Sequence, residues 1–123
     1  PENQKPEAPR IMQAFPMIDS RIQMVIKPPY RDGGAQIMKY KISWDTLASL
    51  EAVRNVNVSI IDLKFIPGTS SFVYELEPDS QPLQPWTTYF LHVQAFNDVG
   101  ISDASEKISV LTSVPPRAPR HTS

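Results

Sequence analysis

Residues 87–97 constrain the fold of this chain more than any other segment. Apolar side chains recur at Tyr89, Leu91, Val93 and Ala95, and mostly polar or aromatic side chains occupy the positions between them. Successive side chains of a β-strand point to opposite faces of its sheet. This period of two therefore predicts a strand with one face on a hydrophobic core, and that core needs a second layer to close it.

The other segments with β character are short and are separated by turn residues. They lie at 22–26, 37–44, 56–65, 72–76 and 107–112. A change of phase at Ile60 and Ile61 predicts a β-bulge. Residues 45–54 predict either a short helical turn with Asp45 as N-cap or a loop. Because no long helix is indicated, the pattern predicts an all-β, antiparallel sandwich.

The proline distribution divides the chain. Thirteen prolines occur against four glycines, and the two ends are polar and rich in proline. Such segments are extended and form neither a helix nor a central strand. We therefore predict linkers at 1–8 and 115–123, and one domain over 9–114, which fits a sandwich of about 100 residues.

The composition excludes several classes of function. The twelve basic residues are scattered and the net charge is −1, so no nucleic-acid surface is expected. The chain has no cysteine, which excludes a disulfide framework and a cysteine zinc site. No apolar run approaches the roughly 20 residues of a membrane span, so we expect no direct membrane insertion by this segment.

The side chains that could perform catalysis do not converge. His92 is predicted on the outward face of its strand, and His121 lies in the terminal tail. Carboxylates at a spacing that would complete a metal site are not found. We expect no catalytic residue, no metal and no cofactor.

Residues 83–89 carry the most specific motif of the sequence. The pattern is L-x-P-x-T-x-Y, formed by Leu83, Pro85, Thr87 and Tyr89. This motif and the strand that follows it resemble the E–F corner and strand F of fibronectin type III domains. The spacing of Tyr40, Ile42 and Trp44 is similar to strand C of the same family.

This resemblance implies a seven-stranded antiparallel immunoglobulin-like β-sandwich with the fibronectin type III topology. The family's corner tyrosine packs its ring in the core, and its hydroxyl bonds the backbone a few residues upstream. The family usually has a tryptophan in strand B, where this chain has Ile26. The expected core consists of Ile26, Tyr40, Ile42, Trp44, Leu91, Val93 and Ala95.

Within the family, residues 34–44 are similar to strand C of neural-cell-adhesion-type membrane-proximal modules. The resemblance implies a non-catalytic binding or spacer module of a larger cell-adhesion molecule or receptor, on the extracellular side of the cell surface. Its partners would be proteins and neighbouring domains of the same chain. Two alternatives remain: a module of a cytosolic scaffold or muscle protein, and an accessory domain of a secreted carbohydrate-acting enzyme.

Four residues are candidates for modification or contact. Asn57 begins an Asn-Val-Ser acceptor pattern for N-glycosylation. Trp86, Phe90 and Phe96 are aromatic residues at positions predicted to face outward, where they could contact a protein partner. The connections at 45–55 and 77–82 are longer than usual for the family, and functional surface tends to lie on loops.

Overall fold

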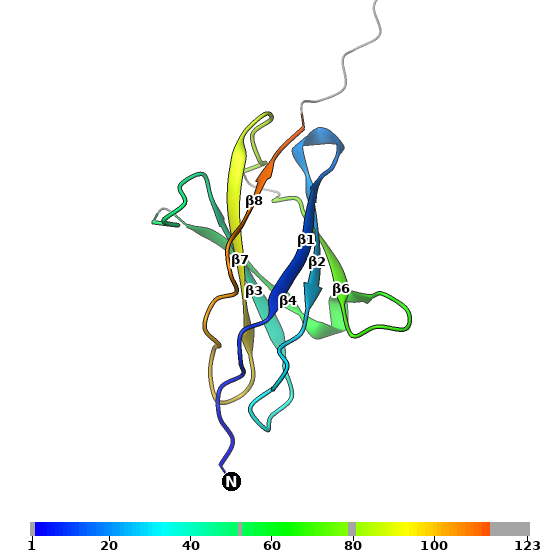
Figure 1. Ribbon diagram of the computed structural model, residues 1–123, viewed down its shortest axis with the longest axis vertical. Helices are drawn as coiled ribbons and strands as arrows, with labels where there is room; N and C mark the ends of the chain where they lie inside the picture. The colour runs from blue at the N-terminus through cyan, green and yellow to red at the C-terminus, as the bar shows by residue number, and fades with distance from the viewer. Residues whose placement is uncertain (1, 52, 79–80, 114–123) are drawn as a thin grey trace, which may run out of the picture.

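Two antiparallel sheets pack face to face in this protein (Figure 1). The computed structural model describes residues 2–51, 53–78 and 81–113. One sheet has the strand order β1-β2-β6-β5, and the other has the order β4-β3-β7-β8. The strands are β1 (Arg10–Pro16), β2 (Ile22–Lys27), β3 (Lys39–Asp45), β4 (Arg54–Ser59), β5 (Lys64–Phe65), β6 (Phe72–Leu76), β7 (Thr88–Phe96) and β8 (Ile108–Leu111).

This architecture confirms the predicted antiparallel sandwich. The structure has eight strands where seven were expected, and the two-residue strand β5 accounts for the difference. β5 extends the first sheet by pairing with β6.

The core lies between the two sheets, where alternate side chains of β2, β3, β6 and β7 meet. All seven expected core residues are buried. Ile26 is fully buried and pairs with Phe72 on β6, so Phe72 supplies an aromatic ring beside the position where the family has tryptophan. The Phe72 ring packs against that of Tyr40 with 4.8 Å between centroids, which joins the two sheets at this point.

The prediction of one bulged strand over 56–65 was wrong. β4 ends at Ser59, and a 3-10 helix η2 (Ile60–Asp62) carries the chain to β5 in the other sheet. The Ser59 hydroxyl accepts a hydrogen bond from the backbone N–H of Ile61 and so caps this short helix. The change of phase at Ile60 and Ile61 therefore marks a crossing between sheets, not a bulge.

Two further segments differ from the simple strand pattern. Asp45 is the last residue of β3 and not a helix N-cap, and residues 46–51 form a turn with no helix, closed by a hydrogen bond from the Leu50 N–H to the Leu47 carbonyl. At the start of the chain, β1 is a strand that the pattern did not single out. It lies at the edge of its sheet, and its register shifts between Ile11 and Gln13 at a bulge.

The structure describes one of the two predicted linkers, apart from its first residue. Residues 2–8 lie against the sandwich and hydrogen-bond to it, through Gln4 and Glu7 among others. Their role in joining another module stays a prediction. The predicted segment 115–123, like residue 114 at the domain boundary, lies outside the described residues.

The corner before β7 contains the hydrogen bond that the motif predicts. The Tyr89 ring is buried, and its hydroxyl accepts a hydrogen bond from the backbone N–H of Gln84 at 2.7 Å. Leu83 is buried beside it, while Pro85 is exposed. The Thr87 hydroxyl donates to the Pro85 carbonyl at 2.9 Å, which tightens the turn between them.

Thr112, the residue after β8, braces this corner although it is 25 residues from Thr87 in the sequence, and the motif gives no sign of it. Its fully buried hydroxyl lies 2.6 Å from the Gln84 carbonyl and accepts from the Thr87 N–H at 3.0 Å. Its own N–H donates to the Thr87 carbonyl at 2.9 Å. The corner is therefore tied both to β7 and to the residue that follows β8.

We expect Tyr89→Phe to destabilise the fold by about 1–3 kcal/mol, because the Gln84 N–H would lose its partner in a partly buried position. Chemical denaturation monitored by tryptophan fluorescence measures this change. Tyr30→Phe is the matched control, since Tyr30 is 89% exposed and should tolerate the same change without effect. An unchanged midpoint for Tyr89→Phe would contradict the structural role of the corner bond.

We expect Thr112→Val, which keeps the side-chain shape, to cost about 1–3 kcal/mol of stability. The Thr87 N–H and the Gln84 carbonyl, whose bonds to Thr112 are partly buried, would each lose a partner. Thr69→Val is the control because Thr69 makes the same two kinds of bond in an exposed loop, where water replaces the hydroxyl. Equal losses for the two variants in thermal unfolding would show that Thr112 does not brace the corner.

Candidate functional site

A catalytic or metal site needs several reactive side chains that lie close together. Within residues 2–51, 53–78 and 81–113, no group of three or more His, Cys, Asp or Glu side chains is placed to hold a metal ion. In the same part of the chain, no helix is long and apolar enough to cross a membrane. His121 lies outside the described residues.

His92 is half-buried on the outward face of β7, as its place in the alternation predicts. Burial lowers the pKa of His92 below its usual value of 6.5, and the nearby charges of Lys41 and Lys107 lower it further. Each of these effects disfavours the imidazolium form. His92 is therefore neutral at pH 7 and lies among cations on a sheet surface.

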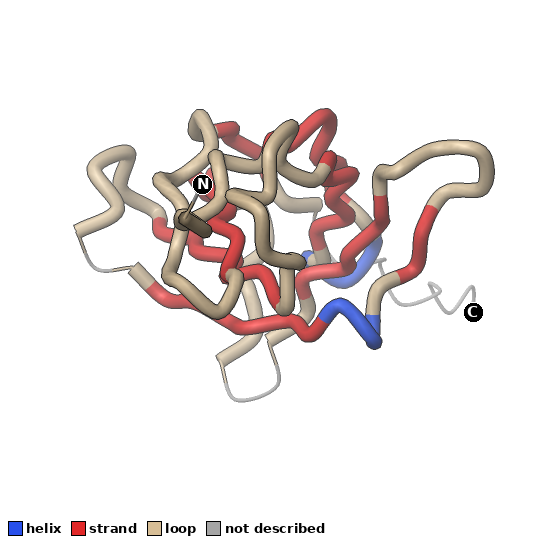
Figure 2. Tube along the Cα trace, turned by 90° about the horizontal axis from the view of Figure 1, so that it is seen from below, coloured by secondary structure: helices blue, strands red, loops and turns tan. Residues whose placement is uncertain are grey.

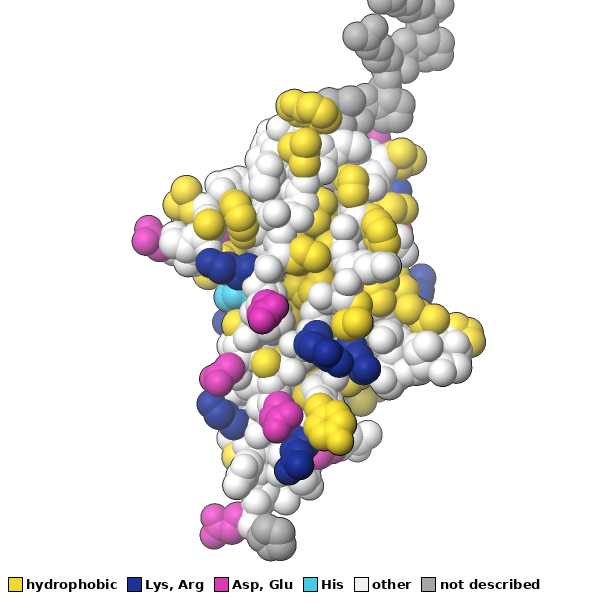
Figure 3. All heavy atoms as spheres, in the orientation of Figure 1, with side chains coloured by type: hydrophobic (Ala, Val, Ile, Leu, Met, Phe, Trp, Pro, Cys, Tyr) yellow, Lys and Arg dark blue, Asp and Glu magenta, His cyan; other side chains and the backbone are white. Residues whose placement is uncertain are grey.

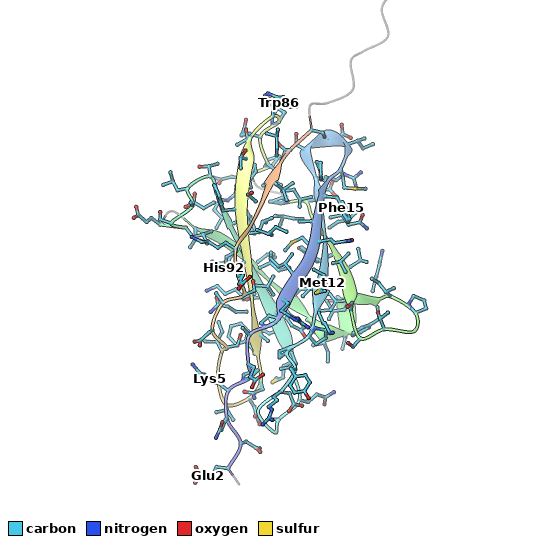
Figure 4. The ribbon with its side chains drawn as sticks, in the orientation of Figure 1. Glu2, Lys5, Met12, Phe15, Trp86 and His92 are labelled. Carbon is cyan, nitrogen blue, oxygen red and sulfur yellow. The ribbon has the colours of Figure 1, made fainter. Side chains whose placement is uncertain are left out.

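Trp86 is displayed at one end of the molecule. Figure 4 shows it at the tip opposite the end that carries Glu2 and Lys5. Its side chain is 68% exposed, and its backbone lies in the left-handed region with φ of 52°. A bulky residue is rarely found in this conformation, which normally costs about 1–2 kcal/mol. The braced corner formed by residues 83–89 holds it there.

Phe90 and Phe96 do not join Trp86 in one surface. Both rings are half-buried on the outward face of β7. They are six residues apart along one strand, which corresponds to about 20 Å. The ammonium of Lys39 lies 4.6 Å from the centroid of the Phe96 ring and covers part of it. Of the three aromatic candidates, Trp86 alone is prominently exposed, and the contact role of each stays a prediction.

An apolar strip lies on the face where β1 and β8 run side by side (Figure 3). β1 exposes Met12 and Phe15, and β8 exposes Leu111. The two strands are edges of different sheets, and these three side chains are between 43% and 49% exposed in the described part of the chain. Sequence analysis missed this strip, because β1 does not alternate and was not recognised as a strand.

Asn57 lies on β4, at the edge of the second sheet, and is exposed. It pairs with Lys41 on β3, which places it on the outward face of that sheet. Ser59, the third residue of the acceptor pattern, caps η2. The position is accessible to a modifying enzyme, and its glycosylation stays a prediction.

At the other end of the sandwich, Asn97 uses every hydrogen-bonding position of its side chain. Its amide nitrogen donates to the carbonyls of Gln4 at 2.7 Å and Asp32 at 2.8 Å. Its amide oxygen accepts from the backbone N–H groups of Val99 and Gly100. The spacing Asn97-x-x-Gly100 indicates the turn, but the distant partners Gln4 and Asp32 leave no local trace in the sequence.

The chain was compared with family profiles, curated proteins and solved structures, and a family profile and solved structures match it. The family profile described as the fibronectin type III domain matches residues 7–111. No curated protein matches the chain significantly. Many solved structures are similar to it.

Among the similar structures, domains A168–A170 of titin are 20% identical, with a TM-score of 0.68 over 90% of this chain and 33% of theirs. The sixth fibronectin type III domain of human fibronectin type III domain containing protein 3 is 21% identical, with a TM-score of 0.60 over 99% of this chain and 95% of that one. A myokine structure is 19% identical, with a TM-score of 0.59 over 89% and 99%.

At these identities the similar structures show the fold alone. The family match shows the family as well as the fold, because it covers most of the chain and includes the corner motif and the strands on both sides of it. Domains of this kind are modules of multidomain proteins and are generally not catalytic. The chain belongs to the fibronectin type III family.

Proposed function

We propose that this domain is a non-catalytic binding and spacing module of a larger cell-surface protein, an adhesion molecule or receptor. In this proposal it contacts a protein partner through Trp86, and further modules of the same chain flank it. The single observation that carries the contact role is the display of Trp86 in a strained conformation on a braced corner.

The strain at Trp86 supports a role in binding. A large exposed aromatic ring adds nothing to the core, and its left-handed backbone costs stability. Strain of this kind persists where the surrounding structure enforces it, and it tends to occur at functional positions. Tryptophan is also enriched among the residues that contribute most to protein–protein binding. Rigid display lowers the entropy lost on contact with a partner.

The cell-surface location rests on Asn57. Its side chain is exposed on the edge strand β4, so the acceptor pattern is accessible for an N-linked glycan. A glycan at this position would also cover the free edge of β4, which could otherwise pair with a strand of another chain. A cytosolic scaffold module remains the rival, since a cytosolic protein would leave the acceptor pattern unused.

We expect Trp86→Asn to leave the free energy of unfolding unchanged or to raise it by up to about 1 kcal/mol, because asparagine tolerates the left-handed region. Equilibrium denaturation followed by far-UV circular dichroism measures the change. A loss of more than about 1 kcal/mol would show that Trp86 stabilises the corner and would contradict a role reserved for binding.

We expect the domain to carry one N-linked glycan when it is secreted from a eukaryotic cell. Intact mass before and after glycosidase treatment detects it, and Asn57→Gln and Ser59→Ala should both abolish it. Asn55→Gln is the matched control, since Asn55 is exposed on the same strand but begins no acceptor pattern. An unmodified chain would remove the support for the cell-surface location and favour the cytosolic rival.

A further inference from the structure

Residues 2–8 run across one end of the sandwich, between the 28–38 loop and the 97–100 turn. Figure 2 looks at this end and shows the N-terminal segment among the loops that surround it. The Gln4 N–H donates to the Gly33 carbonyl at 2.8 Å, and the Glu7 N–H donates to the Arg31 carbonyl at 3.0 Å. Two backbone hydrogen bonds to one loop are typical of paired backbone, not of a free linker.

Asn97 joins the segment to the turn on its other side. One amide proton goes to the Gln4 carbonyl and the other to the Asp32 carbonyl, so a single buried side chain holds the segment, the 28–38 loop and the turn together. A buried amide that lost these partners would leave its donors unsatisfied, which destabilises the fold. The three pieces of backbone therefore stabilise one another.

Gly33 makes the close approach possible. A Cβ atom at this position would lie 2.1 Å from the Gln4 carbonyl oxygen and 2.7 Å from that of Lys5, which are backbone atoms that cannot turn away. Its φ of 81° also lies in the left-handed region. Gly34 differs, because a Cβ atom there would lie 2.8 Å from Oδ1 of Asn3, an exposed side chain that can move away. Gly33 is therefore the glycine of this loop that the close approach of the segment requires.

Buried prolines anchor the segment where it enters the domain. Pro6 and Pro9 are both buried, although the residues around them are mostly exposed. The ion pair between Lys5 and Asp103, at 3.3 Å, lies at the surface and adds little. The segment is therefore held by backbone contacts, the Asn97 amide and two proline rings.

We propose that residues 2–8 form a strap that locks the 28–38 loop and the 97–100 turn into one rigid surface. The strap also fixes the direction in which the chain enters the domain. Combined with the proposed spacing role, on which this last consequence rests, a module attached before the strap would be held at one orientation instead of swinging on a flexible joint. The interface that it would meet is the strap together with the loop that the strap holds.

Hydrogen exchange and 15N relaxation of the whole chain test the strap. In the wild-type protein, we expect the Gln4 and Glu7 amides to exchange at least about tenfold more slowly than in a peptide of residues 1–9. Their heteronuclear NOE values should match those of the strands. Both properties should approach the peptide values in Gly33→Ala, whose Cβ collides with the strap.

Two further variants separate the strap from other effects. Gly68→Ala is the matched control, because Gly68 has a φ of 79° but nothing lies within 4 Å of its Cβ position. It carries the backbone strain without the collision and should leave the strap unchanged. Asn97→Asp at pH 7 still accepts from Val99 and Gly100 but cannot donate to Gln4 and Asp32, so it should release the strap while the turn stays closed.

The proposal is overturned if Gln4 and Glu7 in the wild-type chain behave as they do in the free peptide. It is also overturned if Gly33→Ala and Asn97→Asp leave their exchange unchanged. Because the chain has no cysteine, Glu2→Cys accepts a single spin label, which should broaden the amides of one restricted set of loop residues and not of the whole surface. These readouts need neither a glycan nor a partner, so they succeed or fail independently of the proposed function.

Discussion

The packing of alternate side chains between two sheets is the interaction on which the rest of this domain depends. β3 and β7 turn one face inward, and β2 and β6 turn theirs to meet it. Burial of apolar surface is worth roughly 25 cal/mol per Å², and it must offset the conformational entropy lost by the chain. With no cysteine, the protein has no disulfide to lower that entropy in the unfolded state. The core and the hydrogen bonds around it therefore stabilise the fold without a covalent cross-link.

At the two ends of the sandwich, backbone N–H and C=O groups lie beyond the strand pairs and need hydrogen-bond partners from side chains. At one end, Tyr89 and Thr112 give partners to the backbone of Gln84 and Thr87. At the other end, Asn97 does the same for the strap and the 28–38 loop. Each device places a polar side chain where water is excluded, so each bond is costly to lose. The strands define the sandwich, and these side chains close it.

Closing the ends also determines what the domain can present to other proteins. The braced corner holds Trp86 outward in a conformation that an unbraced loop would relax. With the proposed spacing role, the strap would make the opposite end a firm attachment point for a preceding module. A module with a rigid corner at one end and a rigid strap at the other would set both the spacing and the relative orientation of its neighbours in a multidomain chain. Both properties arise from hydrogen bonds at the ends and not from the core.

Local pattern was sufficient where one face of a strand is buried. The period of two over 87–97 and 40–44 predicted β7, β3 and the core residues on them, and the motif at 83–89 predicted the tyrosine corner. The sandwich and its family followed from these segments. Neighbouring side chains of a strand face opposite sides of the sheet, so the burial of one face produces an alternation of apolar and polar residues that can be recognised in a short stretch of sequence.

The tertiary structure decided everything that depends on partners far along the chain. β1 lies on an exposed edge with a bulge, so its sequence shows no alternation. The crossing through η2 follows from the position of two sheets in space, and the brace at Thr112 links residues 25 and 28 positions apart. The proline pattern predicts a linker over residues 1–8. Only the tertiary structure shows that Asn97, 93 residues from Gln4, holds residues 2–8 on the domain. Composition determines which conformations such a segment can adopt, and only the surface it meets determines whether it stays there.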